Sequence, residues 1–241
     1  MKAAPLLVLV MACGGGSAPP AKPEPVLSER ASTRVPVEED ENEDGVTMLN
    51  SRGRMDPKVI EAGIAPHTVA LTECYTTQLK KRRWLGGHVV IHWDISKDGT
   101  VTAVRLAESD LGAWPIEKCL LDVARLAVFG PPINGDADFQ IPLDFTAKGR
   151  LISWDEDQAV RAVGGQLVKL DVCATKKIAA PSDVTVTVYV GPGGKAQSVG
   201  FASTAVIDDA WAECAAKAAL ALRLPDPKGQ IAKLAVKYRA E

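Results

Sequence analysis

The chain has 241 residues, with 28 basic and 30 acidic side chains, a formal net charge of −2 and five cysteines. A charge balance this close to neutral, without a basic cluster, argues against a nucleic-acid-binding protein. Roughly 190 residues follow the polar N-terminal part of the chain, enough for two domains of under a hundred residues each.

The first twelve residues have the features of an export signal. Lys2 precedes a short apolar run that ends with Val10-Met11-Ala12, directly before Cys13. The run is too short to span a bilayer. It resembles a bacterial lipoprotein signal peptide, which implies cleavage before Cys13 and a lipid on that cysteine. The alternative is an ordinary secretory signal followed by an incidental cysteine. Gly14 resembles the pattern of lipoproteins exported to the outer membrane, which implies a periplasmic location there.

Residues 13–54 are rich in Gly, Ser, Pro and charge, with an acidic run between Glu38 and Asp44. Such a segment cannot bury enough apolar surface to offset its ordering entropy, so we predict a disordered tether. Its root-mean-square reach is about 35 Å. The acidic run is a solvated spacer or, alternatively, a docking site for a basic partner.

The stretch from Gly87 to Cys119 predicts a β-hairpin followed by a helix. Apolar residues alternate along the first strand and resume in the second with one change of phase, which predicts a bulge. Lys97-Asp98-Gly99 supplies the turn. The apolar positions are Val89, Ile91, Trp93, Ile95, Val101, Val104, Leu106, and then, at helical spacing, Ile116, Cys119, Leu120, Val123 and Ala127.

The same plan returns 95 residues later without a gap. Val184 to Val190 alternate with polar residues as Val89 to Ile95 do. Gly99, Ser109, Ile116, Cys119, Phe129 and Pro132 correspond to Gly194, Thr204, Trp211, Cys214, Leu224 and Pro227. We interpret this match of the apolar pattern and of the glycine, cysteine and proline positions as an internal repeat.

Four of the five cysteines fall two in each repeat, and in an exported chain they can form disulfides. The earlier cysteine of each repeat lies on a predicted amphipathic helix, with Leu71, Cys74, Tyr75, Gln78 and Leu79 in the first and Val163, Leu167, Leu170 and Cys173 in the second. Both cysteines of a repeat therefore face the same sheet. Of the three pairings open to four cysteines, we predict Cys74–Cys119 and Cys173–Cys214. Apolar neighbours and the lack of a CxxC motif argue against reactive thiols.

A third strand closes each repeat, with Phe139, Ile141, Leu143 and Phe145 in the first and Leu234, Val236 and Tyr238 in the second. Pro142 places the first of these strands at an edge or a bulge. The predicted fold is α+β, with two domains at 55–148 and 149–241. Each has the order helix, strand, strand, helix, strand, and a three-stranded sheet covered by helices.

This order, the glycine turn, Ser109 after the second strand and Phe129-Gly130-Pro131-Pro132 resemble the C-terminal domain of TonB. They are more similar still to the AgmX/PglI C-terminal domain of myxobacterial proteins linked to gliding motility. The resemblance covers about Ala65–Ala147 and, more loosely, Asp155–Ala240. It implies two tandem copies of a periplasmic, non-enzymatic interaction module. The chain departs from these families in having a lipid anchor in place of a transmembrane helix.

The sequence contains no catalytic constellation, and we expect no metal and no cofactor. His88 and His92 would lie about 13 Å apart on one strand face, too far to share a metal ion. Asp94, Asp98 and Glu108 gather near the hairpin, as expected of a solvated face.

Two classes of function remain. The first is a lipid-anchored envelope adaptor or scaffold, without catalysis, that binds another envelope protein by strand addition or across a helix face. The strand with Leu234, Val236 and Tyr238 is the candidate partner-binding strand, because it has no proline. The second is a lipoprotein that binds a ligand or glycan with exposed tryptophans. The five tryptophans are more often core or rim residues than a sugar platform; they are Trp84, Trp93, Trp114, Trp154 and Trp211.

Overall fold

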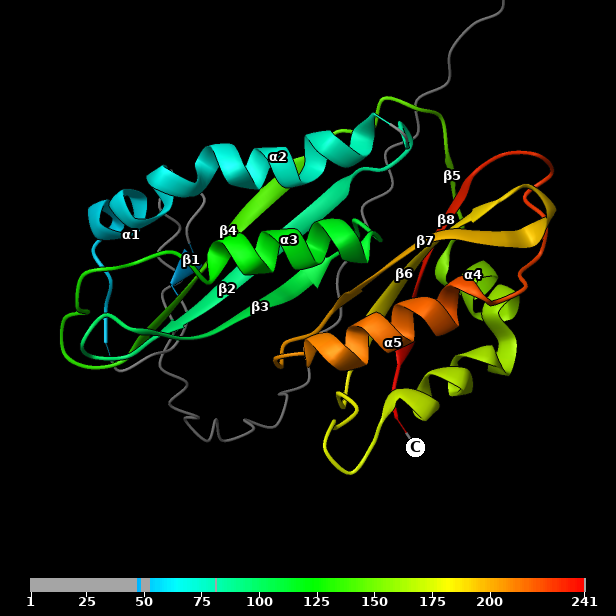
Figure 1. The fold of residues 1–241 in the computed structure, drawn as a ribbon. Helices are drawn as coiled ribbons and strands as arrows, with labels where there is room; N and C mark the ends of the chain where they lie inside the picture. The colour runs from blue at the N-terminus through cyan, green and yellow to red at the C-terminus, as the bar shows by residue number, and fades with distance from the viewer. Residues whose placement is uncertain (1–46, 49–52, 81, 241) are drawn as a thin grey trace, which may run out of the picture. The chain divides into compact units, whose positions relative to one another are not determined.

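The chain folds into two four-stranded sheets, one in each half, with helices packed on one face of each sheet (Figure 1). The structure is a computed structural model that describes residues 47–48, 53–80 and 82–240. These residues belong to one compact unit, Glu39–Glu241. The α+β class predicted from the sequence is confirmed. The prediction of three-stranded sheets is wrong, because a two-residue strand adds to each sheet.

The first sheet has the order β1-β4-β2-β3 and is antiparallel throughout. Its strands are β1 (Thr47–Met48), β2 (Gly87–Ile95), β3 (Val101–Ser109) and β4 (Ala137–Phe145), and its helices are α1 (Pro57–Ile64), η1 (Ala65–His67), α2 (Thr68–Leu79) and α3 (Trp114–Ala124). Asp56 caps α1 by accepting a hydrogen bond from the Lys58 N–H, and Pro57 occupies the first turn, where no N–H is needed.

The β2–β3 hairpin contains the predicted bulge. Asp94 pairs with Ala103 and Ile95 with Val101, so that Thr102 is the extra residue. A second register shift near Val90 leaves Ala107 unpaired. These bulges account for the change of phase in the apolar pattern of β3.

The second sheet has the corresponding order β5-β8-β6-β7. Its strands are β5 (Ile152–Ser153), β6 (Val184–Gly191), β7 (Lys195–Ala202) and β8 (Ala232–Tyr238), and its helices are α4 (Glu156–Val163), η2 (Gly164–Cys173), η3 (Pro192–Gly194) and α5 (Asp209–Leu220). The sheets differ in that β5 is parallel to β8, whereas β1 is antiparallel to β4.

The predicted helix around Cys173 differs from the structure. The α-helix ends at Val163, and the following residues to Cys173 form a 3₁₀ helix. Gly164 has a φ of 53°, which ends α4, and the Gly164-Gly165 pair disfavours a continuous α-helix. Leu170 and Cys173 are nevertheless buried, as the apolar stripe predicts.

Residues that lie 95 positions apart in the sequence, the offset of the internal repeat, have the same structural role in the two halves. Gly99 and Gly194 both have positive φ, and a Cβ at either would collide with the carbonyl group of Phe129 or Leu224, which are themselves 95 residues apart. Asn134 and Gly229, again 95 residues apart, both have positive φ in the loop before the last strand. The two halves therefore repeat one backbone plan.

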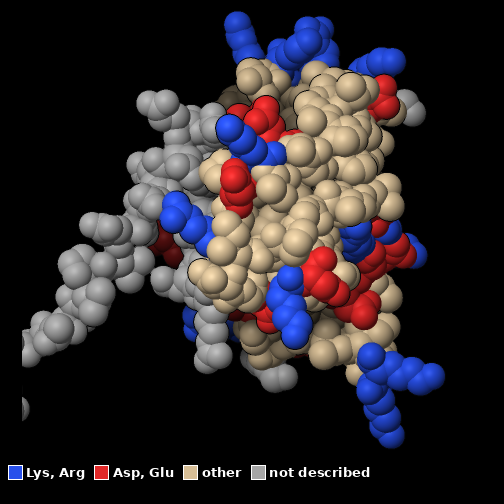
Figure 2. All heavy atoms as spheres, turned by 90° about the vertical axis from the view of Figure 1, so that its left-hand side faces the viewer, with Lys and Arg blue, Asp and Glu red and all other residues tan. Residues whose placement is uncertain are grey.

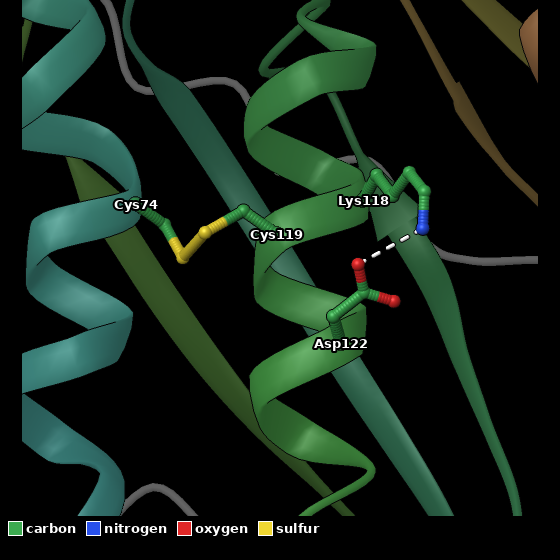
Figure 3. The surroundings of a disulfide bond; sticks show 4 residues. All are labelled: Cys74, Lys118, Cys119 and Asp122. Carbon is green, nitrogen blue, oxygen red and sulfur yellow. Dashed lines mark hydrogen bonds and ion pairs between the residues drawn. A yellow bond between two sulfur atoms is a disulfide. The ribbon is translucent and has the colours of Figure 1, made fainter.

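Each half contains the disulfide expected from the sequence, Cys74–Cys119 and Cys173–Cys214, with Cα–Cα distances of 5.7 and 5.6 Å. Figure 3 shows the first bond joining α2 to α3, beside the ion pair of Lys118 and Asp122. The bonds close loops with sequence separations of 45 and 41 residues. In the chain-entropy account, each contributes about 4 kcal/mol to the free energy of unfolding.

The two halves contact each other where β3 meets β7. The Ser203 N–H, just after β7, donates to the Leu106 carbonyl of β3 at 2.8 Å. Tyr189 of β6 donates its hydroxyl proton to the Gly86 carbonyl at 2.7 Å. Arg125, after α3, donates two hydrogen bonds of 3.1 Å to Asp209 of α5. The halves therefore contact each other around Leu106 of β3 and at the end of β7.

Candidate binding surfaces

The candidate strand, β8, is present, but its predicted residues face inward. Leu234, Val236 and Tyr238 are buried against the helical layer. Tyr238 also bonds through its hydroxyl to Asp171 of η2. These side chains hold the strand in the sheet, so that any partner at this strand would meet its backbone and its outward side chains.

The outer edge of β8 is covered at its start and open further along. On that side the Ile231 and Lys233 carbonyls accept hydrogen bonds of 2.9 Å from the N–H groups of Ile152 and Trp154. Because backbone groups alternate in direction along a strand, the N–H and C=O of Ala235 and Lys237 point to the same side. Among the described strands, none pairs with Ala235 or Lys237 on that edge.

A groove of about 200 Å³ lies beside the end of β8. Its walls come from η2 and the C-terminal strand, with Gly164, Gly165, Leu167, Val168, Asp171, Lys237, Tyr238 and Arg239 as lining residues. The α4–η2 segment also carries exposed valines at 160, 168 and 172. An extended chain added to β8 would therefore meet apolar side chains on one side and Lys237 and Arg239 on the other.

The corresponding edge of β4 is less suited to an added strand. The Asp136 carbonyl accepts a 2.8 Å hydrogen bond from the Gly53 N–H, and β1 pairs with Phe139 and Gln140. Alternation from Asp136 puts Pro142 at an outward position, where its missing N–H removes a donor from the edge without breaking the ladder with β2.

The end of the first half beyond the β2–β3 turn presents an apolar surface. Figure 2, which views the molecule from the side of α1, shows a broad face without charged side chains, with Lys, Arg, Asp and Glu around its margin. The exposed large apolar residues of the elements at this end are Val69, Leu126, Val128 and Ile133. In the 95-residue frame, the last three correspond to Ala221, Arg223 and Lys228. This surface is therefore a property of the first half alone.

The tryptophans do not form an exposed platform. Trp93, Trp114 and Trp211 are buried, and Trp84 and Trp154 are half-buried. The Trp84 ring lies 4.7 Å from the Tyr189 ring, measured between centroids, at the contact between the halves. These rings supply packing area inside the fold, as the core or rim interpretation predicts, and not the exposed surface that the ligand-binding alternative needs.

The polar residues near the hairpin assemble differently from the expectation. His92 is buried on β2, with its Nε2 3.1 Å from Asp94 Oδ1 and 3.5 Å from Asp138 Oδ2. Arg105 bonds to Asp94. Burial and then the Arg105 guanidinium lower the pKa of His92 below its usual value. Sequence reasoning missed Asp138, because only the β2–β4 register places it opposite Asp94.

This polar cluster borders a pocket of about 700 Å³, which runs along the hairpin and the loop before β4. His88 lies apart from it and pairs with Asp144 at 2.9 Å. Within residues 53–80 and 82–240, no three His, Cys, Asp or Glu side chains are placed to hold a metal ion.

A second pocket, of about 540 Å³, lies between the halves. It is lined by His88, Ala107, Glu108, Ser109, Asp110, Thr185, Thr204 and Lys237. Both halves contribute polar groups to it, and no tryptophan lines it.

Cys13 and the acidic run of the predicted tether lie outside the described residues. In the part of the chain that is described, no helix has the length and apolar character needed to span a membrane.

Comparison with known proteins gives no match: no family model, no curated protein and no solved structure is similar enough to the chain to assign it to a family.

Proposed function

We propose that the chain is a non-catalytic, lipid-anchored adaptor of the bacterial cell envelope, which binds an extended segment of another envelope protein along the outer edge of β8. The main support for this proposal is the outer edge of β8, where the backbone groups of Ala235 and Lys237 point outward beyond the end of β5. An added strand gains main-chain hydrogen bonds there, and its alternate side chains meet the groove beside η2.

The order of elements supports the same proposal. Each half contains a glycine-turn hairpin, then a helix, then the outer strand of the long three, as in the TonB-like and AgmX/PglI-like modules that the sequence resembles. Two such modules behind a lipidated Cys13 would make an adaptor on the periplasmic face of the outer membrane, and a link to motility or transport machinery belongs to this proposal. The glycan-binding alternative loses its support, since none of the five tryptophans is exposed.

The substitution Ala235→Pro tests the binding edge. Proline removes the outward N–H of Ala235 and leaves the ladder with β6, which uses the neighbouring residues. We expect capture of the partner from envelope extracts by the full chain to weaken about tenfold or more, because one ladder bond and the close approach of the strand are both lost. Ala235→Ser keeps the N–H and should bind as the native chain does. Equal capture by the native chain and a folded Ala235→Pro variant would contradict the proposal.

The substitution Cys13→Ala tests the anchor. Removal of the lipidated cysteine should move the protein from the membrane fraction to the soluble fraction, because a tether without lipid has nothing to insert. Cell fractionation measures the distribution. An unchanged membrane fraction would show that the lipoprotein assignment is wrong and would leave the β8 proposal standing.

A further inference from the structure

Glu117 is the only acidic residue that is buried among those that the structure describes. It lies on α3 with a relative exposure of 0%. Its Oε1 accepts a 2.8 Å hydrogen bond from the Ser109 hydroxyl, and its Oε2 accepts a 2.9 Å hydrogen bond from the Phe201 N–H of β7. One carboxyl group thus joins the two halves.

The bond to Phe201 occupies the inner edge of the second sheet. Phe201 and Ser203 alternate with residues that face β6, so both N–H groups point toward the first half. The Glu117 carboxyl accepts the hydrogen bond from the Phe201 N–H, and the Leu106 carbonyl accepts the one from the Ser203 N–H. Loss of the Glu117 contact would leave an edge donor of β7 without its acceptor.

The equivalent positions of the two halves carry different residues at this contact, so that it occurs once in the described part of the chain. In the 95-residue frame, Glu117 corresponds to Ala212, which is also buried, and Gly200 corresponds to Arg105. A Cβ at Gly200 would collide with both carboxylate oxygens of Glu117. The acid and the glycine that admits it are therefore complementary departures from the shared pattern, one in each half.

The surroundings favour the neutral form of this carboxyl. Burial raises the pKa of Glu117 to about 7, although hydrogen bonds from Ser109 and from backbone N–H groups oppose the shift. In the neutral state one oxygen still accepts from Phe201, and the new O–H can donate to the Ser109 hydroxyl oxygen.

The other charged groups around this contact bond elsewhere. Arg105 pairs with Asp94, Lys118 with Asp122 and Asp209, Arg125 with Asp122 and Asp209, and Lys233 with Asp110, while the Tyr189 hydroxyl donates to Gly86. No described cation is therefore bonded to Glu117 to compensate a negative charge.

We propose that Glu117 is a proton-operated latch between the two halves, whose neutral carboxyl holds β7 against α3 and whose ionisation loosens that contact. Because the pKa is raised in the closed state, the stability of the contact is complete below pH 4.5 and is lost as the pH rises through about 7. Loosening frees the backbone groups of Leu106, Phe201 and Ser203, which are bonded in the closed state.

Amide exchange on the full chain tests the latch. After correction for intrinsic exchange rates, the opening constants of the Phe201 and Ser203 amides should rise roughly 30-fold between pH 5.5 and 8.5, from a closed-state pKa of about 7 and an open-state pKa of 4.5. Glu117→Gln cannot ionise and should show less than about a threefold change. Glu213→Gln, on the exposed side of α5, is the matched control and should behave as the native chain does. The same 30-fold rise in Glu117→Gln would overturn the proposal.

A titration of the native chain covers the case in which Glu117→Gln does not fold. The side-chain carboxyl carbon of Glu117, followed by NMR, should titrate with a midpoint near pH 7. A midpoint below about 5 would overturn the latch, because the carboxyl would then be largely ionised over the whole range from pH 5.5 to 8.5, so that it could not change the opening there.

Discussion

The outer strands β4 and β8 hold the same place in their sheets but offer different edges. β4 has β1 beside its first half and Pro142 in its second. β8 has β5 at its start and then Ala235 and Lys237, whose backbone groups face outward. The comparison shows that one backbone plan can present a blocked edge in one copy and a usable edge in the other through very few residues.

The inner edges of the two sheets also differ from each other, but here the differences are complementary and allow the two halves to pack together. Glu117 in the first half contacts Gly200 in the second. The residues at the equivalent positions of the opposite halves are Ala212 and Arg105, so both members of this contact differ from their counterparts. Departures from the repeat therefore occur at both the inner and the outer edges of the sheets, while the hairpin strands of both halves keep the same alternation.

Removal of either disulfide should have the largest effect on stability. We expect Cys74→Ala with Cys119→Ala, and separately Cys173→Ala with Cys214→Ala, to lower the free energy of unfolding by about 4 kcal/mol each, since the loops are of similar length. Urea unfolding followed by tryptophan fluorescence measures the change. A loss under about 1 kcal/mol in one half would show that the two halves are not stabilised alike.

The next effect concerns the inner edge. Gly200→Ala should lower the free energy of unfolding by about 1–3 kcal/mol, because the new methyl group collides with the Glu117 carboxylate. The matched control is Gly165→Ala, whose added methyl group meets no atom within 4 Å and should change little.

A double-mutant cycle ties this effect to its cause. In a Glu117→Ala background, Gly200→Ala should destabilise the protein much less, because the colliding carboxylate is gone. Additive losses would mean that Gly200 is needed for some reason other than Glu117.

Much of the fold could be predicted from local pattern. Alternation gave the strands of each hairpin, and the helical stripe around Cys74 correctly placed that cysteine against Cys119. The two-residue strands β1 and β5 could not be predicted, because two residues carry no periodicity. The 3₁₀ helix before Cys173 was missed although Gly164-Gly165 signals a break in an α-helix.

The candidate sites were harder to predict, because they depend on register and on contacts between the halves. Asp138 lies near His92 only through the pairing of β4 with β2. Glu117 lies at a helix position that is occupied by the buried Ala212 in the second repeat, so the repeat predicts an apolar residue there. Only the close approach of Gly200 explains an acidic residue at this position. A strand's alternation also predicts which side chains are buried, but not which edge is left open.

The smallest effect concerns the outer edge of β4. Pro142→Ala should change the free energy of unfolding by at most about 1 kcal/mol, because the proline nitrogen faces away from β2 and only the unfolded-state entropy of proline is lost. Ile141→Pro, at the neighbouring inward position, is the control and should cost more, since it removes a ladder bond to β2. Similar losses for both variants would mean that Pro142 is oriented differently.

The most direct test of the proposed adaptor function is amide exchange of β8 with and without the captured partner. Leu234 and Val236 already bond to β6, so their amides should be protected in both states. The account predicts new protection at Ala235 and Lys237 when the partner is bound, because an added strand accepts their outward N–H groups. Partner-induced protection confined to residues before Arg54, with Ala235 and Lys237 unchanged, would contradict it.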